Sequence, residues 1–555
     1  EQVTDLNEMV VVGYGQVKKK DLTGAVASLQ SDDVVRSNPV NATKALQGQV
    51  AGVVVQKKNN QPGQDFAIDI RGENTINYST EPLVVIDGLI GGRLRDINPN
   101  DIQSIDILKD ASSTAIYGSR GANGVVIVTT KKGKTGRPTV TLDSYVGYKK
   151  PAHQPALQTA QEYYKTFVED KVMDGGVAAK LTSNEKAMVE SGKSTDWVDM
   201  VTRPGLQTSN NVSLSGGSQN TTYRFSGDYL QEDGNLLYTD YKRYNLNAGM
   251  DSRINKFLKA GFTAYLNYST QATGSRESLR SAYRARPTGT PYYDDLADPS
   301  DGYDIAFDPF KGYAVWMGIN DAQVMNPVIE ADPENSQYQV NTTNMMGNAY
   351  IEIAPVKGLR FRSSISASMT GEKDGDYRGT YSKDRKGTQK PKATYISRDW
   401  WNYTIDNQLT YDLNKGDHRL TVTALQSAYK QRNELYAIAV EDLPYPSLWY
   451  NVGTYGNLGK LPKDISPDQK PIASDLKERT LLSYMGRINY NFRDKYLLTL
   501  TGRSDGASQL PEGHQWAFFP SAAVAWRVIE ENFMKNINTF SDLKLRVSYG
   551  EVGNS

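Results

Sequence analysis

The sequence contains no cysteine and very little histidine. Without cysteine the chain can form no disulfide, no thiolate metal site and no cysteine nucleophile. Its three histidines, His153, His418 and His514, are scattered, so they lack the close spacing of a zinc motif. Three dispersed histidines also give no basis for a serine–histidine–aspartate arrangement. We therefore expect no catalytic residue, no metal, no cofactor and no enzymatic activity.

Long apolar runs and an excess of one charge are also missing. No segment approaches the roughly 18 consecutive apolar residues of a transmembrane helix. The 63 basic and 63 acidic residues balance to a net charge of +0, so no overall field favours nucleic acid. A mean hydropathy of -0.57 still allows a membrane barrel, because barrel strands alternate apolar and polar residues.

Tyrosine and glycine are abundant instead, with 35 and 47 residues. Tyrosine is typical of the aromatic girdles that membrane barrels place at both interfaces. On composition alone, a soluble all-β protein is the alternative.

The first part of the chain, residues 21–136, has the pattern of a compact α+β domain. Short apolar runs end at glycine or aspartate–glycine pairs, which is typical of short strands and tight turns. The pattern predicts helices over 44–50 and 110–117, and strands over 53–55, 67–71, 83–86, 99–108 and 125–130.

From residue 137 onward the pattern changes to a two-residue alternation. Tyr223, Phe225 and Tyr229 share one face of a strand, while Arg224 and Asp228 take the other. Each run has about ten residues, which is the length of a tilted strand that crosses a bilayer. The same alternation recurs over 246–251, 258–268, 359–369, 420–424, 484–490 and 496–502.

The connections between these runs alternate in length. Short turns are predicted at 216–220, 254–257, 355–358, 414–417 and 493–495. Long polar segments are predicted at about 270–339, 371–398 and 430–477. Short turns at one end and long loops at the other are the arrangement of an outer-membrane barrel, which favours a barrel over a soluble sandwich.

Two other interpretations can be set aside from spacing. The glycines of 118–124 precede a strand and lack the opening of a dinucleotide fingerprint. Gly133-Lys134-Thr135 copies the end of a phosphate-binding loop, but Val128 stands where that loop needs glycine. Paired acids such as Asp294 and Asp295 lie in polar loops, where they are normally solvated.

Four stretches within 69–132 carry a family resemblance: Asp69–Gly72, Pro82–Gly88, Ser104–Gly124 and Val125–Lys132. The order of these stretches and their amino-acid sequences are similar to those of the plug of TonB-dependent transporters. Lys109-Asp110-Ala111-Ser112, Gly63 and the tail Met9–Gly15 resemble the SusC-like branch of Bacteroidetes nutrient importers. The motif residues concerned are Arg71, Gly72, Asp87, Gly88, Lys109, Asp110, Tyr117, Gly118, Arg120 and Gly121.

This resemblance implies a mainly β protein with an N-terminal α+β plug domain inside a large antiparallel transmembrane β-barrel. It assigns 1–20 to a TonB box and linker, 21–136 to the plug and 137–555 to the N-terminal part of the barrel. Such barrels close with about 22 strands, and only about a dozen are recognisable in the sequence. Because an open edge cannot face lipid, we expect the other strands to follow in a longer polypeptide or to come from another chain.

The resemblance also implies a function. It is TonB-dependent import of a nutrient, foremost glycan oligosaccharides, across the outer membrane of a Gram-negative bacterium. The implied partners are TonB, a SusD-like surface lipoprotein, outer-membrane lipid and a second importer–lid pair in a SusC2D2-type dimer. A peptide importer or a siderophore or cobalamin receptor differs only in cargo. A non-energised surface-binding or adhesion barrel is the alternative from another class.

Three groups of residues are candidates for contacts. The TonB box is placed at Leu6, Asn7, Glu8, Met9, Val10, Val11, Val12, Gly13 and Tyr14, where an apolar strand suits pairing with a partner's sheet. Arg71 and Arg120 are candidate ion-pair partners of barrel-wall carboxylates. Aromatic residues in or beside long loops could stack on sugars or on a lid, or else form a girdle or loop core. They are Tyr313, Trp316, Trp400, Trp401, Tyr445, Trp449 and Tyr450.

Overall fold

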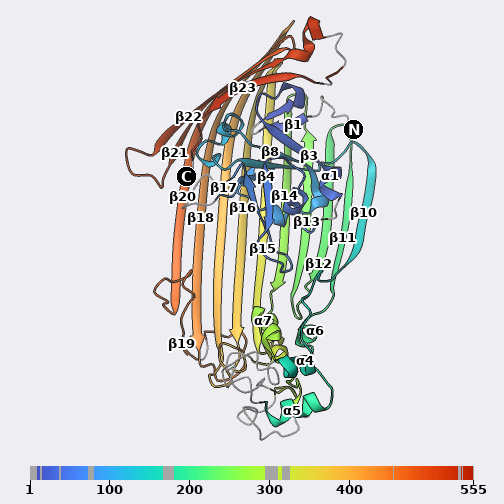
Figure 1. The fold of residues 1–555 in the computed structure, drawn as a ribbon. Coiled ribbons are helices and arrows are strands. Elements are labelled where there is room, and N and C mark those ends of the chain that lie inside the picture. The colour runs from blue at the N-terminus through green and yellow to red at the C-terminus, as the bar shows by residue number, and fades with distance from the viewer. Residues whose placement is uncertain are drawn as a thin grey trace.

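The protein has two parts, a long curved β-sheet and a small α+β region that lies within its curve, nearer one end (Figure 1). The structure is a computed structural model. It describes residues 9–12, 15–36, 39–72, 80–166, 181–293, 310–314, 325–453, 456–534, 539–540 and 542–553. The sheet is called the wall below, and residues 15–130 are called the plug-like region. This arrangement confirms the predicted mainly β fold with an N-terminal α+β part.

The wall is an antiparallel meander in which each strand pairs with the next one along the chain. Its edges are β10 and β23, and the short strand β19 (Asn457–Leu458) pairs with β18. The other strands are β10 (Gly136–Lys149), β11 (Gly205–Gly217), β12 (Thr221–Asp233), β13 (Asp240–Arg253), β14 (Leu258–Ala272), β15 (Ser336–Val356), β16 (Leu359–Arg378), β17 (Lys392–Lys415), β18 (His418–Glu441), β20 (Ile472–Phe492), β21 (Tyr496–Ala507), β22 (Trp516–Arg527) and β23 (Lys544–Gly550).

The side chains of the wall are apolar outside and polar inside. Leu266 pairs with Met345 across β14 and β15, and both side chains are exposed on the outer surface. One residue along, Asn267 pairs with Asn344, and both are buried on the inner face, where Asn344 donates to Asp96 of the plug-like region over 2.8 Å. A water-soluble sandwich would place the apolar set inside. The opposite polarity is typical of a sheet that faces lipid.

The predicted turns are confirmed, but several strands are much longer than about ten residues. β17 and β18 each have 24 residues. The segments expected to be loops at 371–398 and 430–477 are therefore partly strand, and the connections shrink to 379–391 and 442–471. The loops were predicted too long because strand residues beyond the apolar band are polar on both faces, so their sequence resembles that of a loop. The end of the wall with the long connections is called the loop end, and the opposite end is called the turn end.

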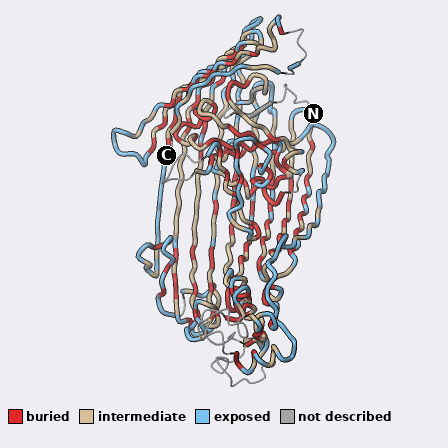
Figure 2. Tube along the Cα trace, in the orientation of Figure 1, coloured by how far each residue is buried: buried red, intermediate tan, exposed pale blue. Residues whose placement is uncertain are grey.

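The plug-like region is built on a five-stranded sheet in the order β3-β8-β9-β6-β7. Its core comes from β8 and β9, where Ile105, Ile107, Val126 and Val128 are buried. Buried segments, drawn in red, are frequent in the plug-like region (Figure 2). A separate hairpin pairs β4 with β5. The elements are β3 (Val26–Gln30), α1 (Ser31–Val35), α2 (Ala42–Ala45), β4 (Val53–Lys57), β5 (Phe66–Ile70), β6 (Leu83–Ile86), β7 (Leu89–Ile90), β8 (Ile102–Leu108), α3 (Ala111–Thr114), η4 (Ala115–Arg120) and β9 (Val125–Thr130).

The predicted strands over 83–86 and 125–130 are confirmed at both ends, whereas both predicted helices are wrong in extent. The first helix begins earlier, at Ala42, because the Asn41 side chain accepts from the Lys44 N–H and caps it. It ends at Ala45, and Gly48 adopts a φ of +71° just beyond. The second helix stops at Thr114 and continues as a 3-10 turn that Gly118 interrupts with a φ of +55°.

The remaining elements lie at the two ends of the wall. At the loop end are α4 (Ala160–Tyr164), α5 (Ser183–Glu190), α6 (Trp197–Val201), α7 (Arg276–Arg284) and α8 (Pro327–Ala331) (Figure 1). Before the plug sheet, β1 (Met9–Val12) pairs with β2 (Gly15–Lys18) in an antiparallel hairpin. In the described part of the chain, no helix has the length and hydropathy needed to cross a membrane.

Candidate site between plug-like region and wall

The Tyr117–Ser119 turn is held by a buried ion pair of the wall. Arg503 and Asp505 are neighbours on the inner face of β21, and Arg503 Nε donates to Asp505 Oδ1 over 2.7 Å. Arg503 Nη1 also donates to the Ile116 carbonyl over 2.6 Å, and Asp505 Oδ2 accepts from the Ser119 N–H over 2.8 Å. Charged groups that are fully buried need such partners, so this turn and the wall satisfy each other.

Gly118 is the residue that allows this close approach. A Cβ on Gly118 would lie 2.2 Å from Asp505 Oδ2 and 2.7 Å from Arg503 Nε. Its φ of +55° is also in the left-handed region that side chains rarely adopt. The Tyr-Gly motif therefore serves a contact with the wall as well as a turn.

Asp87 and Gly88 form a second contact between the two parts. Asp87 Oδ1 accepts from the Thr130 N–H over 3.0 Å, which joins the ends of the parallel strands β6 and β9. The hydroxyl of Tyr265, on β14 of the wall, donates to Asp87 Oδ2 over 2.8 Å. The Ile-Asp-Gly motif thus fixes its own sheet and anchors that sheet to the wall.

Wall arginines also contact the plug-like region on β12 and β13. Arg243, which is only 2% exposed, donates from Nη1 to the carbonyls of Val40 and Arg95, each over 3.1 Å. Its Nη2 donates to Asp228 of the wall over 3.2 Å. Arg224 donates to Asp101 of the plug-like region over 3.0 Å. These inward-facing charges are balanced partly across the interface, which gives the plug-like region a defined seat.

Gly63 lies against the wall as closely as Gly118 does. Its N–H donates to Glu232 Oε2 over 2.9 Å. A Cβ on Gly63 would lie 2.2 Å from the ring of Tyr241, and its φ is +68°. Gly63, one of the residues that resemble the SusC-like branch, is therefore required by its close contact with β12 and β13.

Other motif residues act within the plug-like region. Asp110 caps α3, since its Oδ1 accepts from the Ser113 N–H over 2.9 Å, and its Oδ2 accepts from the Ala25 N–H over 2.6 Å. Lys109 Nζ donates to the Ala51 carbonyl over 2.9 Å, and burial lowers the pKa of this lysine. Gly121 packs closely on the Thr114 carbonyl, where a Cβ would approach to 2.6 Å.

The two candidate arginines differ in their surroundings. Arg71 is exposed in a turn with a φ of +61°, next to Gly72, and no ion pair joins it to a described carboxylate of the wall. The ion pair expected for Arg71 stays a prediction, since Arg71 is exposed among the described residues. Arg120 does reach the wall, where its guanidinium carbon lies 4.8 Å from the centroid of the Tyr429 ring.

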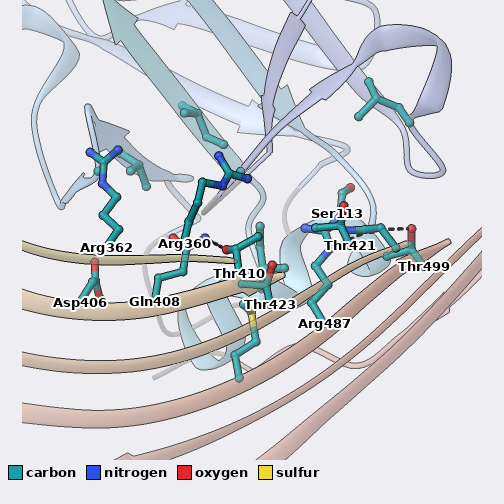
Figure 3. A pocket seen from close by; sticks show the side chains of 18 of the residues that line it. Ser113, Arg360, Arg362, Asp406, Gln408, Thr410, Thr421, Thr423, Arg487 and Thr499 are labelled. Carbon is teal, nitrogen blue, oxygen red and sulfur yellow. Dashed lines mark hydrogen bonds between the residues drawn. The ribbon is translucent and has the colours of Figure 1, made fainter. Parts of the chain in front are cut away.

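A cavity of about 770 Å³ separates the plug-like region from the wall. Plug residues such as Asp21, Gly24, Ser113 and Tyr117 line one side, and β14 to β21 line the other. Figure 3 shows Arg360, Arg362, Gln408 and Thr410 on the wall side of this space. The edge strands β10 and β23 contribute no residue to its lining. We call it the plug–wall cavity.

The predicted loop aromatics are distributed over different environments. Trp400 and Trp401 lie within β17: Trp400 pairs with the inward-facing Thr370, and Trp401 pairs with the outward-facing Met369. Trp449 is 6% exposed and stacks on Tyr395 with ring centroids 6.0 Å apart, so it is part of the loop core.

Three of the other loop aromatics are described and accessible. Tyr445 and Tyr450 are exposed, at 45% and 59%. Tyr313 stacks on Tyr292 with ring centroids 5.3 Å apart. Trp316 lies outside the described residues. The structure therefore leaves Tyr445 and Tyr450 as the best-exposed candidates for an external ligand.

Of the residues assigned to the TonB box, only Met9–Val12 are described, as strand β1. Leu6, Asn7, Glu8, Gly13 and Tyr14 lie outside the described residues. The assignment itself stays a prediction, as do the domain boundaries at 20 and 136.

Sequence reasoning did not find the wall residues Arg503, Asp505, Arg243 and Tyr265. Their only signal was a charged or polar side chain in the inward phase of a strand. That signal is shared by many inner-face residues that do not touch the plug-like region.

Comparison with known proteins identifies a plug domain in the N-terminal part of the chain. Residues 18–125 match the family described as TonB-dependent Receptor Plug Domain. The chain is 34% identical to TonB-dependent receptor P26 of Formosa agariphila over 99% of this chain and 53% of the relative. It is 30% identical to TonB-dependent receptor SusC of Bacteroides thetaiotaomicron over 99% of this chain and 53% of the relative.

The fold is similar to solved structures as well. The RagAB peptide importer in its open-open state superimposes with a TM-score of 0.80 at 24% identity, over 99% of this chain and 62% of that chain. The ferric preacinetobactin receptor BauA of Acinetobacter baumannii gives a TM-score of 0.55 at 13% identity, over 94% of this chain and 64% of that chain. The chain spans about half the length of the curated relatives it matches.

Proposed function

The chain belongs to the SusC-like TonB-dependent receptors, and from that premise we propose that the protein imports a nutrient across the outer membrane of a Gram-negative bacterium. The single observation that carries the proposal is the seating of the plug-like region. It lies inside a wall whose outer face is apolar, and it is held there by buried polar contacts such as Arg503–Ile116 and Tyr265–Asp87. Such an arrangement closes a pore and leaves it able to open.

TonB is the proposed source of energy, and residues 6–14 are its proposed binding strand. An extended apolar segment suits pairing with a partner's sheet, because main-chain hydrogen bonds provide affinity. We expect deletion of 6–14 to abolish uptake while surface binding of the cargo persists. The matched control replaces 6–14 with a scrambled sequence of equal composition. Uptake that survives the deletion would contradict active import and favour a surface-binding barrel.

Oligosaccharides are the proposed cargo, with peptides as the second candidate. The SusC-like resemblance supports glycans, and the exposed rings of Tyr445 and Tyr450 at the loop end can stack on sugar faces. The similarity to a structure titled a peptide importer is one of fold, and it supports the alternative. Growth of a deletion strain on single oligosaccharides, on peptides and under iron limitation distinguishes these cargoes from a siderophore.

A SusD-like lipoprotein is the proposed partner at the loop end. This end carries long connections and several helices, of which α4 to α7 are labelled there in Figure 1. We expect the full-length protein to co-purify with such a lipoprotein in mild detergent, as one pair or as a dimer of pairs. Its native mass would show which assembly forms, and a native mass equal to the importer alone would exclude a stable lid.

A further inference from the structure

The plug–wall cavity contains an arginine that pairs with no described carboxylate. Arg487 projects from β20 on the inner face of the wall, and its Nε donates to Asn489 Oδ1 over 3.2 Å. Its two terminal nitrogens make no hydrogen bond to a described residue, and they belong to a side chain that lines the cavity. A guanidinium in such a place presents a planar pair of donors to whatever enters.

The carboxylates of the same cavity are already engaged with other groups. Asp412 accepts from Arg360 over 2.7 Å, and Glu352 accepts from Lys259 over 3.3 Å. Asp21 accepts from the side-chain amide of Asn491 over 3.1 Å. Asp406 comes from β17, next to Arg362 in Figure 3, and away from Arg487. Arg487 is thus left without a carboxylate partner among the described residues of the cavity.

Two further donors lie beside Arg487. Asn489 Oδ1 accepts from both Arg487 Nε and Thr499 Oγ1, at 3.2 and 3.1 Å, so the amide nitrogen of Asn489 is directed elsewhere. Thr423 is the cross-strand partner of Arg487 on β18, and its hydroxyl also lines the cavity (Figure 3). These three side chains supply N–H and O–H donors and no negative charge.

Two buried side chains beside this cluster reduce the screening of its charge by water. Met485, 5% exposed, lies two residues before Arg487 on the same face, and Tyr117 of the plug-like region, 3% exposed, closes the other side. Less water near a charge means weaker screening, so an oxyanion here gains more from Arg487 than it would at the surface.

We propose that Arg487, Asn489 and Thr423 form a binding site for a carboxylate group within the plug–wall cavity. Guanidinium and carboxylate match in a bidentate, planar pair, and the amide and hydroxyl donors satisfy the remaining lone pairs. This inference rests on the proposed function, because the site would bind acidic cargo on its way past the plug-like region. It deepens that function by giving acidic oligosaccharides, or the carboxylate of a peptide, an advantage over neutral cargo.

The test uses the full-length protein purified in detergent and carbon-13 acetate as the probe. Binding is measured as saturable broadening of the acetate carboxyl resonance at constant ionic strength. We expect acetate to bind the wild type, acetamide not to bind, and Arg487→Gln to weaken acetate binding at least tenfold. Arg493→Gln, which removes an exposed arginine paired with Asp417, is the matched control and should bind acetate normally.

A conservative variant and a competing anion test the acetate site further. Arg487→Lys retains the charge without the planar pair of donors, so it should show intermediate affinity and confirm that the fold tolerates the site. Inorganic phosphate should compete with acetate, because a guanidinium also pairs with phosphate in a bidentate geometry. Acetate binding that is absent in the wild type, or unchanged in Arg487→Gln, would overturn the proposal. Dependence of uptake on residues 6–14 is measured separately, so failure here leaves import untouched.

Discussion

Arg503 and Asp505 of the wall grip opposite ends of one turn in the plug-like region: the arginine holds the Ile116 carbonyl, and the aspartate holds the Ser119 N–H. The two side chains also pair with each other over 2.7 Å, and neither is more than 2% exposed. The turn between them passes so close that only glycine fits at position 118. This clamp leads to the first two predictions.

Gly118→Ala should loosen the clamp. The new Cβ would meet Asp505 at 2.2 Å in a backbone with a φ of +55°, so both collision and strain oppose it. We expect local opening of the turn to become easier by about 1–3 kcal/mol, measured as faster hydrogen exchange of the Ser119 amide. Gly48→Ala is the matched control, because Gly48 has a φ of +71° with no atom within 4 Å of the added Cβ. Equal effects on the local turns would show that the collision is unimportant.

Asp505→Ala should have the larger effect on the seat of the plug-like region. It leaves the Arg503 guanidinium buried without its carboxylate, and breaking such a pair costs about 3–5 kcal/mol. Urea denaturation followed by plug-region fluorescence or hydrogen exchange measures the loss. Asp417→Ala breaks the Arg493–Asp417 pair, whose carboxylate is 54% exposed, and should cost about 0–1 kcal/mol. Losses of the same size in both variants would contradict the structural role of Asp505.

Glu330 should make the loop end sensitive to pH. Its carboxylate is 1% exposed and accepts from the Lys383 N–H over 2.7 Å, and burial raises the pKa of Glu330 above the ordinary 4.5. The unfolded chain therefore releases this proton at lower pH than the folded protein does. The contribution of Glu330 to the free energy of unfolding is fully present below pH 4.5. It decreases as the pH rises through the raised pKa of the folded protein, and above that pKa it no longer changes.

The measurement is hydrogen exchange of the Lys383 amide between pH 4 and 8, corrected for the intrinsic exchange rate. Glu330→Gln should remove the extra pH dependence, because glutamine stays neutral throughout. Glu334→Gln, which alters an exposed side chain on the same connection, should leave the extra pH dependence unchanged. A pH dependence that persists in Glu330→Gln would assign it to another group.

Trp449 and Tyr450 are adjacent in the sequence but should have different roles. Trp449 should stabilise the connection, and Tyr450 should contact the cargo. Trp449 packs so closely on β16 that a Cβ on Gly375 would lie 2.0 Å from its ring. Trp449→Ala should destabilise the 442–471 connection by about 3–5 kcal/mol, measured by limited proteolysis. Tyr450→Ala should leave protease resistance unchanged and weaken surface binding of cargo. The opposite result, with Tyr450→Ala protease-sensitive, would place Tyr450 in the loop core.

The sequence predicts best where one physical cause acts alone. β6 and β9 are buried on both faces and bounded by turns, so their apolar runs marked both ends correctly. The helix near Lys44 was misplaced because a capping bond from Asn41 set its start. β17 and β18 were cut short because their outer parts leave the apolar band, where alternation fades.

The contact residues of the wall were harder to predict for a different reason. Ser119 and Asp505 are separated by 386 positions, and their pairing depends on how the sheet curves around the plug-like region. Nothing in the local pattern of β21 distinguishes Asp505 from other inward polar residues. The motif glycines were found because turns need them, but their second role against the wall required the fold.

The length of β17 and β18 sets a height. Twenty-four residues at about 3.4 Å each make a strand of about 80 Å, which rises about 60 Å at the usual barrel tilt. The apolar band of such a barrel is only about 25 Å tall. The wall therefore extends at the loop end well beyond the lipid headgroups, so under the proposed import a ligand that binds there would still be distant from the plug-like region.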